Sequence, residues 1–258
     1  MTLAARNAVI TGGGRGIGAA VARALAAAGA RVLVAARHPA EVEAVADGLR
    51  GDGWEAFAAR CDVTDAISVT ELARTARARL GAVDILVNNA GTASSAPVLK
   101  ITPDEWQRLF AVNVTGTLLV TQAFLPAMLE RSWGRIVNVA SIAGLTGAKL
   151  IAAYSATKHA VVGFTRAVAA EVSGSGVTVN AVCPGYVDTP LTDATLARIA
   201  ERTKRTRAEA LHMLLEHSGQ PRLVTSEEVA ATVLSLCGDA AATITGQAIV
   251  LDAGALRA

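Results

Sequence analysis

Tyr154 and Lys158 stand four residues apart in the stretch YSATK, and together they could act as an acid and the charge that tunes it. On a helix, residues at this spacing lie on the same face, one turn apart. A free tyrosine has a pKa of about 10 and donates protons slowly at neutral pH, so a nearby cation that lowers this pKa would make it more effective. Both residue types are common on helices, so the rest of the chain has to separate a catalytic pair from an exposed helix pair.

A glycine-rich loop, TGGGRGIG, follows an apolar run that predicts a strand and precedes a run that predicts a helix. In such a place Gly12 permits a tight turn, Gly16 lets the backbone approach a pyrophosphate, and Gly18 lets the helix pack closely against the sheet. The free N–H groups at the start of the helix favour a phosphate. The loop, with Arg15 and Ile17 among its contacts, is therefore predicted to bind a dinucleotide. The alternative is a plain glycine-rich turn.

The end of the second predicted strand indicates which dinucleotide this is. A site for NAD places a carboxylate there to accept hydrogen bonds from the ribose diol, but this sequence has Ala35, Ala36 and Arg37. A guanidinium matches a phosphate in charge and geometry, so Arg37 and Arg15 could together hold a 2′-phosphate. NADP(H) is therefore favoured over NAD(H). The alternative is that Arg37 is a solvated residue at the start of a turn.

Polar and small residues also follow the third and fourth predicted strands. Asp62, next to Val63, could accept a hydrogen bond from an adenine amino group, or it could cap the next helix or form a turn. Asn89, Ala90 and Gly91 form a small-residue turn at the carboxyl edge of the sheet, where doubly wound folds bind ligands. These residues are predicted to lie close to the cofactor.

Seven short apolar runs predict β-strands, and the stretches between them are long enough for helices. Runs that are apolar nearly throughout are typical of parallel strands buried on both faces. They cover residues 7–11, 31–36, 55–63, 84–90, 135–141, 177–184 and 247–252. The predicted fold class is therefore α/β: one doubly wound, Rossmann-like domain over residues 1–258, with a seven-stranded, mostly parallel sheet and helices on both faces. Thr102 and Thr225, each three residues before a glutamate, predict two helix starts.

Composition and charge argue against several classes of protein. The net charge of +2 gives no general footprint for nucleic acid. Three cysteines lack metal-ligand spacing and are interpreted as buried thiols in a reducing compartment, so we expect no metal and a cytoplasmic location; they are Cys61, Cys183 and Cys237. The first residues lack the pattern of a signal peptide. The uncharged stretch 109–129 is long enough to span a bilayer, but polar residues and Pro126 interrupt it, so it is predicted to be a buried or interface helix.

The motifs TGGGRGIG, CDV, NNAG, NVTG, VASIAG, YSATK and CPGYVDTP occur in this order, and over nearly its whole length the chain resembles the short-chain dehydrogenase/reductase family. The resemblance implies a site made of Asn113, Ser141, Tyr154 and Lys158. Tyr154 would be the acid or base, and Lys158 would bind the nicotinamide ribose and, with the oxidised nicotinamide, lower the pKa of Tyr154. Ser141 would hold the substrate oxygen, and Asn113 would hold a water that links Lys158 to solvent. Taken singly, these residues could be a capping serine, a buried amide and an exposed helix pair.

The same resemblance gives a role to the stretch after the sixth predicted strand. Pro184 and Gly185 would cover the nicotinamide, the backbone of Val187 would bind its carboxamide, and Thr189 would contact the carboxamide or a phosphate. The alternative is a simple Pro-Gly turn.

Residues 188–221 are too long for an ordinary connection and look like the helical substrate lid of the family. Six apolar residues could line a pocket or pack the lid helices together: Leu196, Ile199, Leu211, Met213, Leu214 and Leu215. Five cations could receive the phosphates of coenzyme A or of a carrier protein, or form a solvated face: Arg198, Arg202, Lys204, Arg205 and Arg207.

The substrate class follows from resemblance to two branches of the family. VNNAG through CPGYVDTP resembles ketoreductases that act on 3-oxoacyl or polyketide thioesters, and ATITGQAIVLDAG resembles 3-hydroxybutyrate and 3-hydroxyacyl dehydrogenases. We therefore expect an NADP(H)-dependent ketoreductase for a carbonyl β to an acyl group, assembled as a homo-oligomer, commonly a tetramer. The alternatives are a reductase of a free ketone, sugar or cyclic alcohol, and a non-catalytic NADP(H)-binding sensor. One departure from the family stands at Asp252, Ala253 and Gly254, where two glycines are usual.

Overall fold

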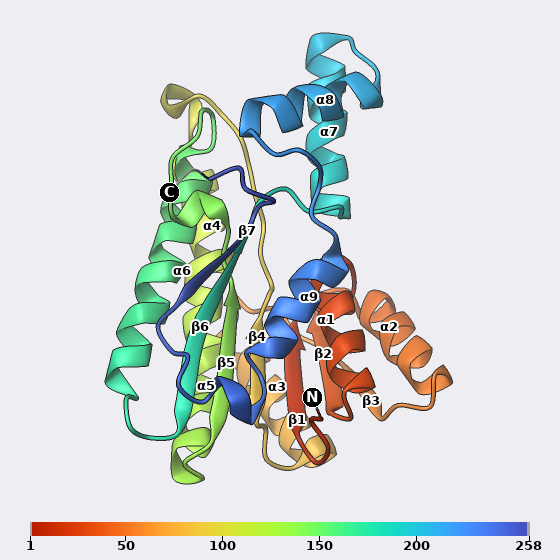
Figure 1. The fold of residues 1–258 in the computed structure, drawn as a ribbon, viewed down its shortest axis with the longest axis vertical. Coiled ribbons are helices and arrows are strands. Elements are labelled where there is room, and N and C mark those ends of the chain that lie inside the picture. The colour runs from red at the N-terminus through yellow and green to blue at the C-terminus, as the bar shows by residue number, and fades with distance from the viewer. Residues whose placement is uncertain (1, 257–258) are drawn as a thin grey trace.

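In the computed structural model, which describes residues 2–256, seven strands form one sheet in the order β3-β2-β1-β4-β5-β6-β7 (Figure 1). Each neighbouring pair is parallel. The strands are β1 Asn7–Thr11, β2 Arg31–Ala36, β3 Ala56–Arg60, β4 Ile85–Asn88, β5 Gly134–Val139, β6 Val177–Pro184 and β7 Ala248–Leu251. The predicted doubly wound α/β class is confirmed. The strand order reverses between β1 and β4, so the carboxyl ends of these two strands flank the crevice where such folds bind ligands.

The predicted strand at residues 55–63 was too long, and so was the one at residues 84–90. β3 ends at Arg60, because a turn begins at Asp62, whose Oδ1 accepts hydrogen bonds from the backbone N–H and the hydroxyl of Thr64. β4 ends at Asn88, because Thr11 Oγ1 accepts hydrogen bonds from the next two backbone N–H groups. At both places, side-chain hydrogen bonds turn the chain out of the sheet.

Helices cover both faces of the sheet (Figure 1). The helices α1, α2 and α9 pack in one apolar core, and α3, α5 and α6 pack in a second core on the opposite face. The helices are α1 Gly16–Ala27, α2 Pro39–Gly51, α3 Ala66–Leu80, α4 Pro103–Phe110, α5 Gly116–Glu130, α6 Ala152–Glu171, α7 Pro190–Thr203, α8 Arg207–Ser218 and α9 Ser226–Ser235. The two predicted helix starts are confirmed, because the side chains of Thr102 and Thr225 accept hydrogen bonds from the N–H groups of Glu105 and Glu228.

The segment predicted as a lid forms α7 and α8, which stand away from the sheet at the top of Figure 1. Leu196, Ala210 and Leu214 form an apolar cluster between these two helices, separate from the cores of the sheet. The two ends of the segment are tied together, because the N–H of Asp188 donates to the C=O of Val224. The predicted lid segment is therefore a helical pair with its own small core and a fixed base.

The helix from Pro103 to Glu130, which joins α4 and α5, has the length and mean hydropathy of a membrane span. Only 39% of its apolar window is buried inside the chain. One face, with Val120, Phe124 and Met128, packs in the core, whereas Leu118 and Leu129 on the other are each 37% exposed. A helix with one buried and one open apolar face agrees with the predicted buried or interface helix.

Candidate active site

The structure places the predicted tyrosine and lysine on α6, one helical turn apart. Lys158 is 6% exposed, and its Nζ donates to the C=O of Val139 at 2.8 Å. The same Nζ lies 5.8 Å from the centroid of the Tyr154 ring. The spacing in the sequence therefore produces the close pair that was predicted from it.

Ser141 lies two residues after the end of β5, near Tyr154. Its Oγ accepts from the N–H of Ala143 at 3.1 Å, which caps the short 3-10 turn Ile142–Gly144. The Ser141 hydroxyl donates to the C=O of Pro184 at 3.4 Å, and it lies near enough to the Tyr154 hydroxyl to favour a lower pKa of that phenol. Three of the four predicted site residues are thus gathered at the carboxyl end of β5, held by two different elements.

Asn113 lies in a π-helical turn, Ala111–Thr115, between α4 and α5. Its side chain is 1% exposed and fully engaged: Oδ1 accepts from the N–H of Thr92, while Nδ2 donates to the C=O of Thr92 and to Oγ1 of Thr157. A Cβ built on Gly91 would lie 3.4 Å from Asn113 Oδ1 and 3.7 Å from Lys158 Nζ. The missing side chain of Gly91 therefore leaves open a space that borders both Asn113 and Lys158, the two residues of the predicted proton path.

Burial shifts the pKa values of the pair. It raises the pKa of Tyr154 to about 12, although the hydrogen bond with Ser141 acts in the opposite direction. It lowers the pKa of Lys158 to about 8. The lowering of the Tyr154 pKa expected from Lys158 together with an oxidised nicotinamide is therefore not present in the chain alone, where burial has the largest effect. The second part of that expectation, the charge of an oxidised nicotinamide, would have to supply the lowering.

The glycine loop has the bare backbone that a pyrophosphate needs. Gly12 and Gly16 have φ values of +63° and +51°, which residues with a Cβ rarely adopt. A Cβ on Gly18 would lie 2.2 Å from the carbonyl oxygen of Gly12, so this glycine packs the start of α1 against the loop itself. A Cβ on Gly16 would face Thr189 at 3.2 Å, which puts the predicted phosphate contacts of Gly16 and Thr189 opposite each other. Ile17, the next residue in α1, is partly buried against the first core.

Asn89, Asp62 and Val63 have structural contacts of their own. Asn89 Nδ2 donates to the carbonyl oxygens of Thr11 and Gly12, so its side chain fastens the loop and leaves only its backbone, with that of Ala90, beside the crevice. Asp62 makes the turn described above, and Asp65 is the residue that caps α3. The proposed helix cap at Asp62 is therefore wrong, whereas the turn is confirmed. The Val63 side chain is buried against Gly116.

The stretch after β6 is fixed by hydrogen bonds to the side chain of Gln220, a residue that no sequence motif indicated. Gln220 is 3% exposed; its Oε1 accepts from the N–H of Tyr186, and its Nε2 donates to the carbonyl oxygens of Tyr186 and Arg222. A Cβ on Gly185 would lie 2.4 Å from Gln220 Oε1. Pro184 and Val187 are buried on either side. The predicted cover of the nicotinamide is therefore a fixed turn.

The comparisons with known proteins agree with this geometry. The family model for short chain dehydrogenase matches residues 6–200. This chain belongs to the short-chain dehydrogenase family. It is 40% identical over 256 residues to a 3-oxoacyl-[acyl-carrier-protein] reductase of Synechocystis sp., covering 98% of this chain and 97% of that one. It is 37% identical over 253 residues to a D-beta-hydroxybutyrate dehydrogenase of Rhizobium meliloti, covering 96% and 98%.

Among solved structures, this short-chain dehydrogenase superposes on a variant of actinorhodin polyketide ketoreductase with NADPH. The TM-score is 0.93 at 38% identity, and the match covers 97% of each chain. The resemblance inferred from the motifs is therefore confirmed over nearly the whole length.

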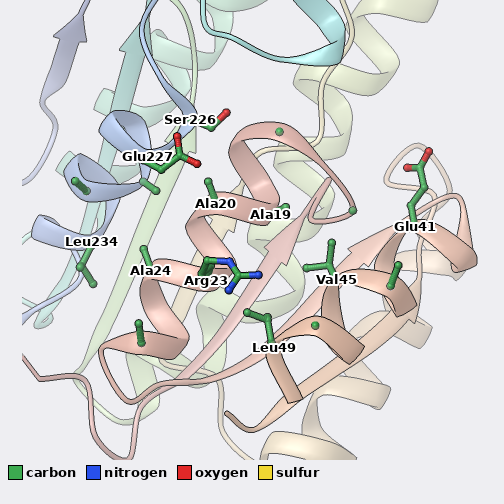
Figure 2. Close-up of a pocket in the computed structure, with 17 residues that line it drawn as sticks. Ala19, Ala20, Arg23, Ala24, Glu41, Val45, Leu49, Ser226, Glu227 and Leu234 are labelled. Atoms are coloured by element: carbon green, nitrogen blue, oxygen red, sulfur yellow. The ribbon is translucent and has the colours of Figure 1, made fainter. Parts of the chain in front are cut away.

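Outside the catalytic crevice, this short-chain dehydrogenase carries an open groove of about 780 Å³ along α1, between α2 and α9 (Figure 2). Small apolar residues such as Ala20 and Ala24 form its floor, with Leu234 on the α9 side and Val45 on the α2 side. Of the predicted site residues it contains Gly16, and it contains none of the four catalytic candidates. Gly14, Gly16 and Glu41 at one end of the groove belong to the glycine loop and its neighbour α2.

Below the site, a chain of buried polar side chains links elements that the motifs did not connect. Asn88 Nδ2 donates to Thr121 Oγ1 on α5 at 3.1 Å and to Asn138 Oδ1 on β5 at 2.9 Å. Asn138 Nδ2 in turn donates to Thr165 Oγ1 on α6 at 2.8 Å. We refer to Asn88, Asn138, Thr121 and Thr165 as the polar chain. The sequence signal for such a chain is an asparagine inside an apolar strand, as at Asn138 in β5, but the motifs did not point to it.

Proposed function

We propose that this short-chain dehydrogenase is an NADP(H)-dependent ketoreductase that reduces a carbonyl β to an acyl thioester. The observation that carries the proposal is the meeting of Ser141, Tyr154 and Lys158 at the carboxyl end of β5, with Asn113 across Gly91. A binding protein without catalysis has no need for a buried lysine beside a partly buried phenol, because an ammonium group is costly to desolvate.

The residues present fit a dinucleotide with a 2′-phosphate. Gly12, Gly16 and Gly18 leave the loop backbone bare, and the exposed side chains of Arg15 and Arg37 supply positive charge near the ends of β1 and β2. When bound, NADPH supplies the hydride. The solved ketoreductase that resembles this chain was crystallised with NADPH, which supports the same cofactor here.

The side chains supply the proton and hold the substrate. Ser141 and Tyr154 donate hydrogen bonds to the carbonyl oxygen, and the phenol gives its proton to that oxygen as the carbon takes the hydride. A pKa of about 12 keeps the phenol protonated at neutral pH, which is the form that reduction requires. The positive charge of Lys158 stabilises the phenolate that this step leaves, and protons return from solvent past Asn113 and Lys158.

The β-carbonyl class is supported by what the relatives are named for. A 3-oxoacyl-[acyl-carrier-protein] reductase and a D-beta-hydroxybutyrate dehydrogenase both handle an oxygen on the third carbon of an acyl group. The cations of the lid are consistent with a phosphate-bearing carrier, because Arg202, Lys204 and Arg205 are exposed around the turn between α7 and α8. Arg207 pairs with Asp193, and Arg198 bonds within α7, so these two are the weaker candidates.

The proposal extends to assembly and location. The open apolar face of α5, with Leu118 and Leu129, and the stacked rings of Trp106 and Phe110 on α4 would be covered in a homo-oligomer, most simply a tetramer. Light scattering in solution tests this. The three free and buried thiols suit the reducing cytoplasm, and we propose that residues 1–258 act there as one domain.

Initial rates of NADPH oxidation test the function, with acetoacetyl-CoA compared with a free cyclic ketone. Preference for the thioester is the expected result, and preference for the cyclic ketone would contradict the substrate class while leaving the chemistry intact. Tyr154→Phe should lower kcat by about 10²–10⁴-fold, the range of general acid catalysis, and still bind NADPH. Turnover that survives Tyr154→Phe would refute the assigned acid.

A further inference from the structure

The region where the proposed 2′-phosphate would bind holds charges of both signs. Arg15 and Arg37 are exposed there. Burial raises the pKa of Asp62, but the hydrogen bonds from Thr64 and, to a smaller extent, the positive charge of Arg37 lower it, and the net shift is downward. A second carboxylate, that of Glu41, lies closer to the loop. Two guanidinium groups therefore face two carboxylates where a doubly charged phosphate has to be held.

Glu41 contacts the glycine loop directly. It lies in the first turn of α2, and its Oε1 is 3.7 Å from an Arg15 guanidinium nitrogen. A Cβ on Gly14 would lie 2.8 Å from Glu41 Cβ and 3.3 Å from Glu41 Oε2, so the glutamate folds back along the loop at this glycine. Figure 2 shows Glu41 at the edge of the groove, with its carboxylate directed away from the apolar floor.

We propose that Glu41 is a specificity-determining residue that limits the preference of this enzyme for NADP(H) over NAD(H). The Glu41 carboxylate competes with the 2′-phosphate for Arg15 and repels the phosphate itself. With NAD(H), which carries a ribose hydroxyl at this position, neither effect operates. This inference rests on the proposed NADP(H) site and adds to it a residue that opposes the two arginines.

The size of the effect follows from exposure. Arg15 and Glu41 are 66% and 36% exposed, so water and salt screen the interaction. Exposed charge pairs contribute up to about 1 kcal/mol, which converts to about a fivefold change in affinity. Neutralising Glu41 should therefore tighten binding of a 2′-phosphate about three- to fivefold at low salt, and the gain should shrink at high salt.

Binding of 2′,5′-ADP and of 5′-AMP, measured by isothermal titration calorimetry, isolates the 2′-phosphate without any turnover. The variants are Glu41→Gln and, as the matched control, Glu43→Gln, which removes the same charge two residues along α2, where Glu43 pairs with Arg50. We expect Glu41→Gln alone to tighten 2′,5′-ADP about three- to fivefold and to leave 5′-AMP within about twofold. In an Arg15→Gln background, most of that gain should disappear.

Other outcomes overturn the inference. Unchanged or weaker binding of 2′,5′-ADP by Glu41→Gln would show that Glu41 does not oppose the phosphate. Equal tightening of both ligands, or equal effects of Glu41→Gln and Glu43→Gln, would indicate a change in general charge. If the unmodified enzyme bound 2′,5′-ADP no better than 5′-AMP, the proposed cofactor preference would fail, and this inference with it; a preference that is present but insensitive to Glu41→Gln removes the inference alone.

Discussion

Gly144 ends the 3-10 turn that begins just after Ser141, and its missing side chain lets that turn pack on α6. A Cβ at this position would lie 2.6 Å from the carbonyl oxygen of Lys158 and 2.8 Å from its carbonyl carbon. Ordinary contacts between carbon and carbonyl oxygen are about 3.3–3.6 Å, so Gly144→Ala requires a displacement of about 1 Å. Backbone atoms inside a helix cannot rotate away, so the turn itself must move, and Ser141 moves with it.

The expected result is a folded enzyme with a misaligned site. Overpacking of this kind costs about 1–3 kcal/mol of stability. A displacement of about 1 Å between catalytic groups can cost about 10²-fold in rate, so kcat should fall by about that factor. NADPH binding should change less, because the glycine loop predicted to hold the pyrophosphate does not contact Gly144. Steady-state rates, urea denaturation and cofactor titration on one preparation measure the three quantities.

Gly147 provides the matched control. It lies in the same segment, it is not among the glycines with positive φ, and a Cβ there meets nothing within 4 Å. Gly147→Ala should therefore leave kcat within about twofold of the unmodified enzyme, as expected of a surface change. A normal kcat in Gly144→Ala would refute the reasoning from contact distance. An equal loss in both variants would show that the mobility of the segment matters, and not its packing on Lys158.

Three further predictions concern stability and the base of the lid. Ala253 has φ +54°, a conformation that costs a residue with a Cβ about 1–2 kcal/mol, so Ala253→Gly should raise the free energy of unfolding by up to about 1 kcal/mol, whereas Ala242→Gly, at φ −59°, should lower it by about 0.5–1 kcal/mol; equal effects would argue against strain at Ala253. The pKa of Lys158 is lowered from 10.5 to about 8, so between these values the unfolded chain binds more protons and stability rises with pH; urea denaturation should show this rise, about 3 kcal/mol at most, and Lys158→Met should flatten it, while a rise that persists would place its source elsewhere. Gln220→Leu leaves the N–H of Tyr186 and the C=O of Arg222 without partners, whereas the C=O of Tyr186 keeps the N–H of Val224, so we expect a loss of about 2–3 kcal/mol and a raised KM for the carbonyl substrate, with Gln220→Glu, which keeps one acceptor, intermediate in KM; an unchanged KM in both would show that this turn does not position substrate.

The sequence predicted the layer architecture because each strand is a local pattern. An apolar run between turn residues identifies a buried parallel strand without any knowledge of its neighbours, and six of the seven predicted runs contain the observed strand completely; the run at 135–141 starts one residue late, at Arg135. The motifs also singled out the four catalytic candidates, because Tyr154 and Lys158 share a helix face and Ser141 follows a strand by two residues. Strand ends were less predictable, because they depend on hydrogen bonds such as those from the backbone to Thr11, contributed by residues far along the chain.

Features that depend on contacts between two segments far apart in the sequence could not be predicted from the sequence. The contact of Gln220 with Gly185 and that of Glu41 with Gly14 join residues whose types say nothing of each other. The raised pKa of Tyr154 depends on how deeply the phenol is desolvated, which is a property of the packed fold. The departure at Ala253 was visible in the sequence, but its left-handed backbone was not.

The polar chain beneath the site has a consequence for how the chain folds. Asn88 and Asn138 are direct register partners in the β4–β5 pair. A slip of one residue between these strands would turn the two amides to opposite faces of the sheet, and each amide left buried without a partner costs about 1–3 kcal/mol. The hydrogen bonds of the polar chain therefore favour one alignment of β4, β5, α5 and α6, because any other alignment leaves buried amides without partners. Because β5 precedes Ser141 and α6 carries Tyr154 and Lys158, the bond between Asn138 and Thr165 fixes the relative position of these site residues in the folded chain without any ligand.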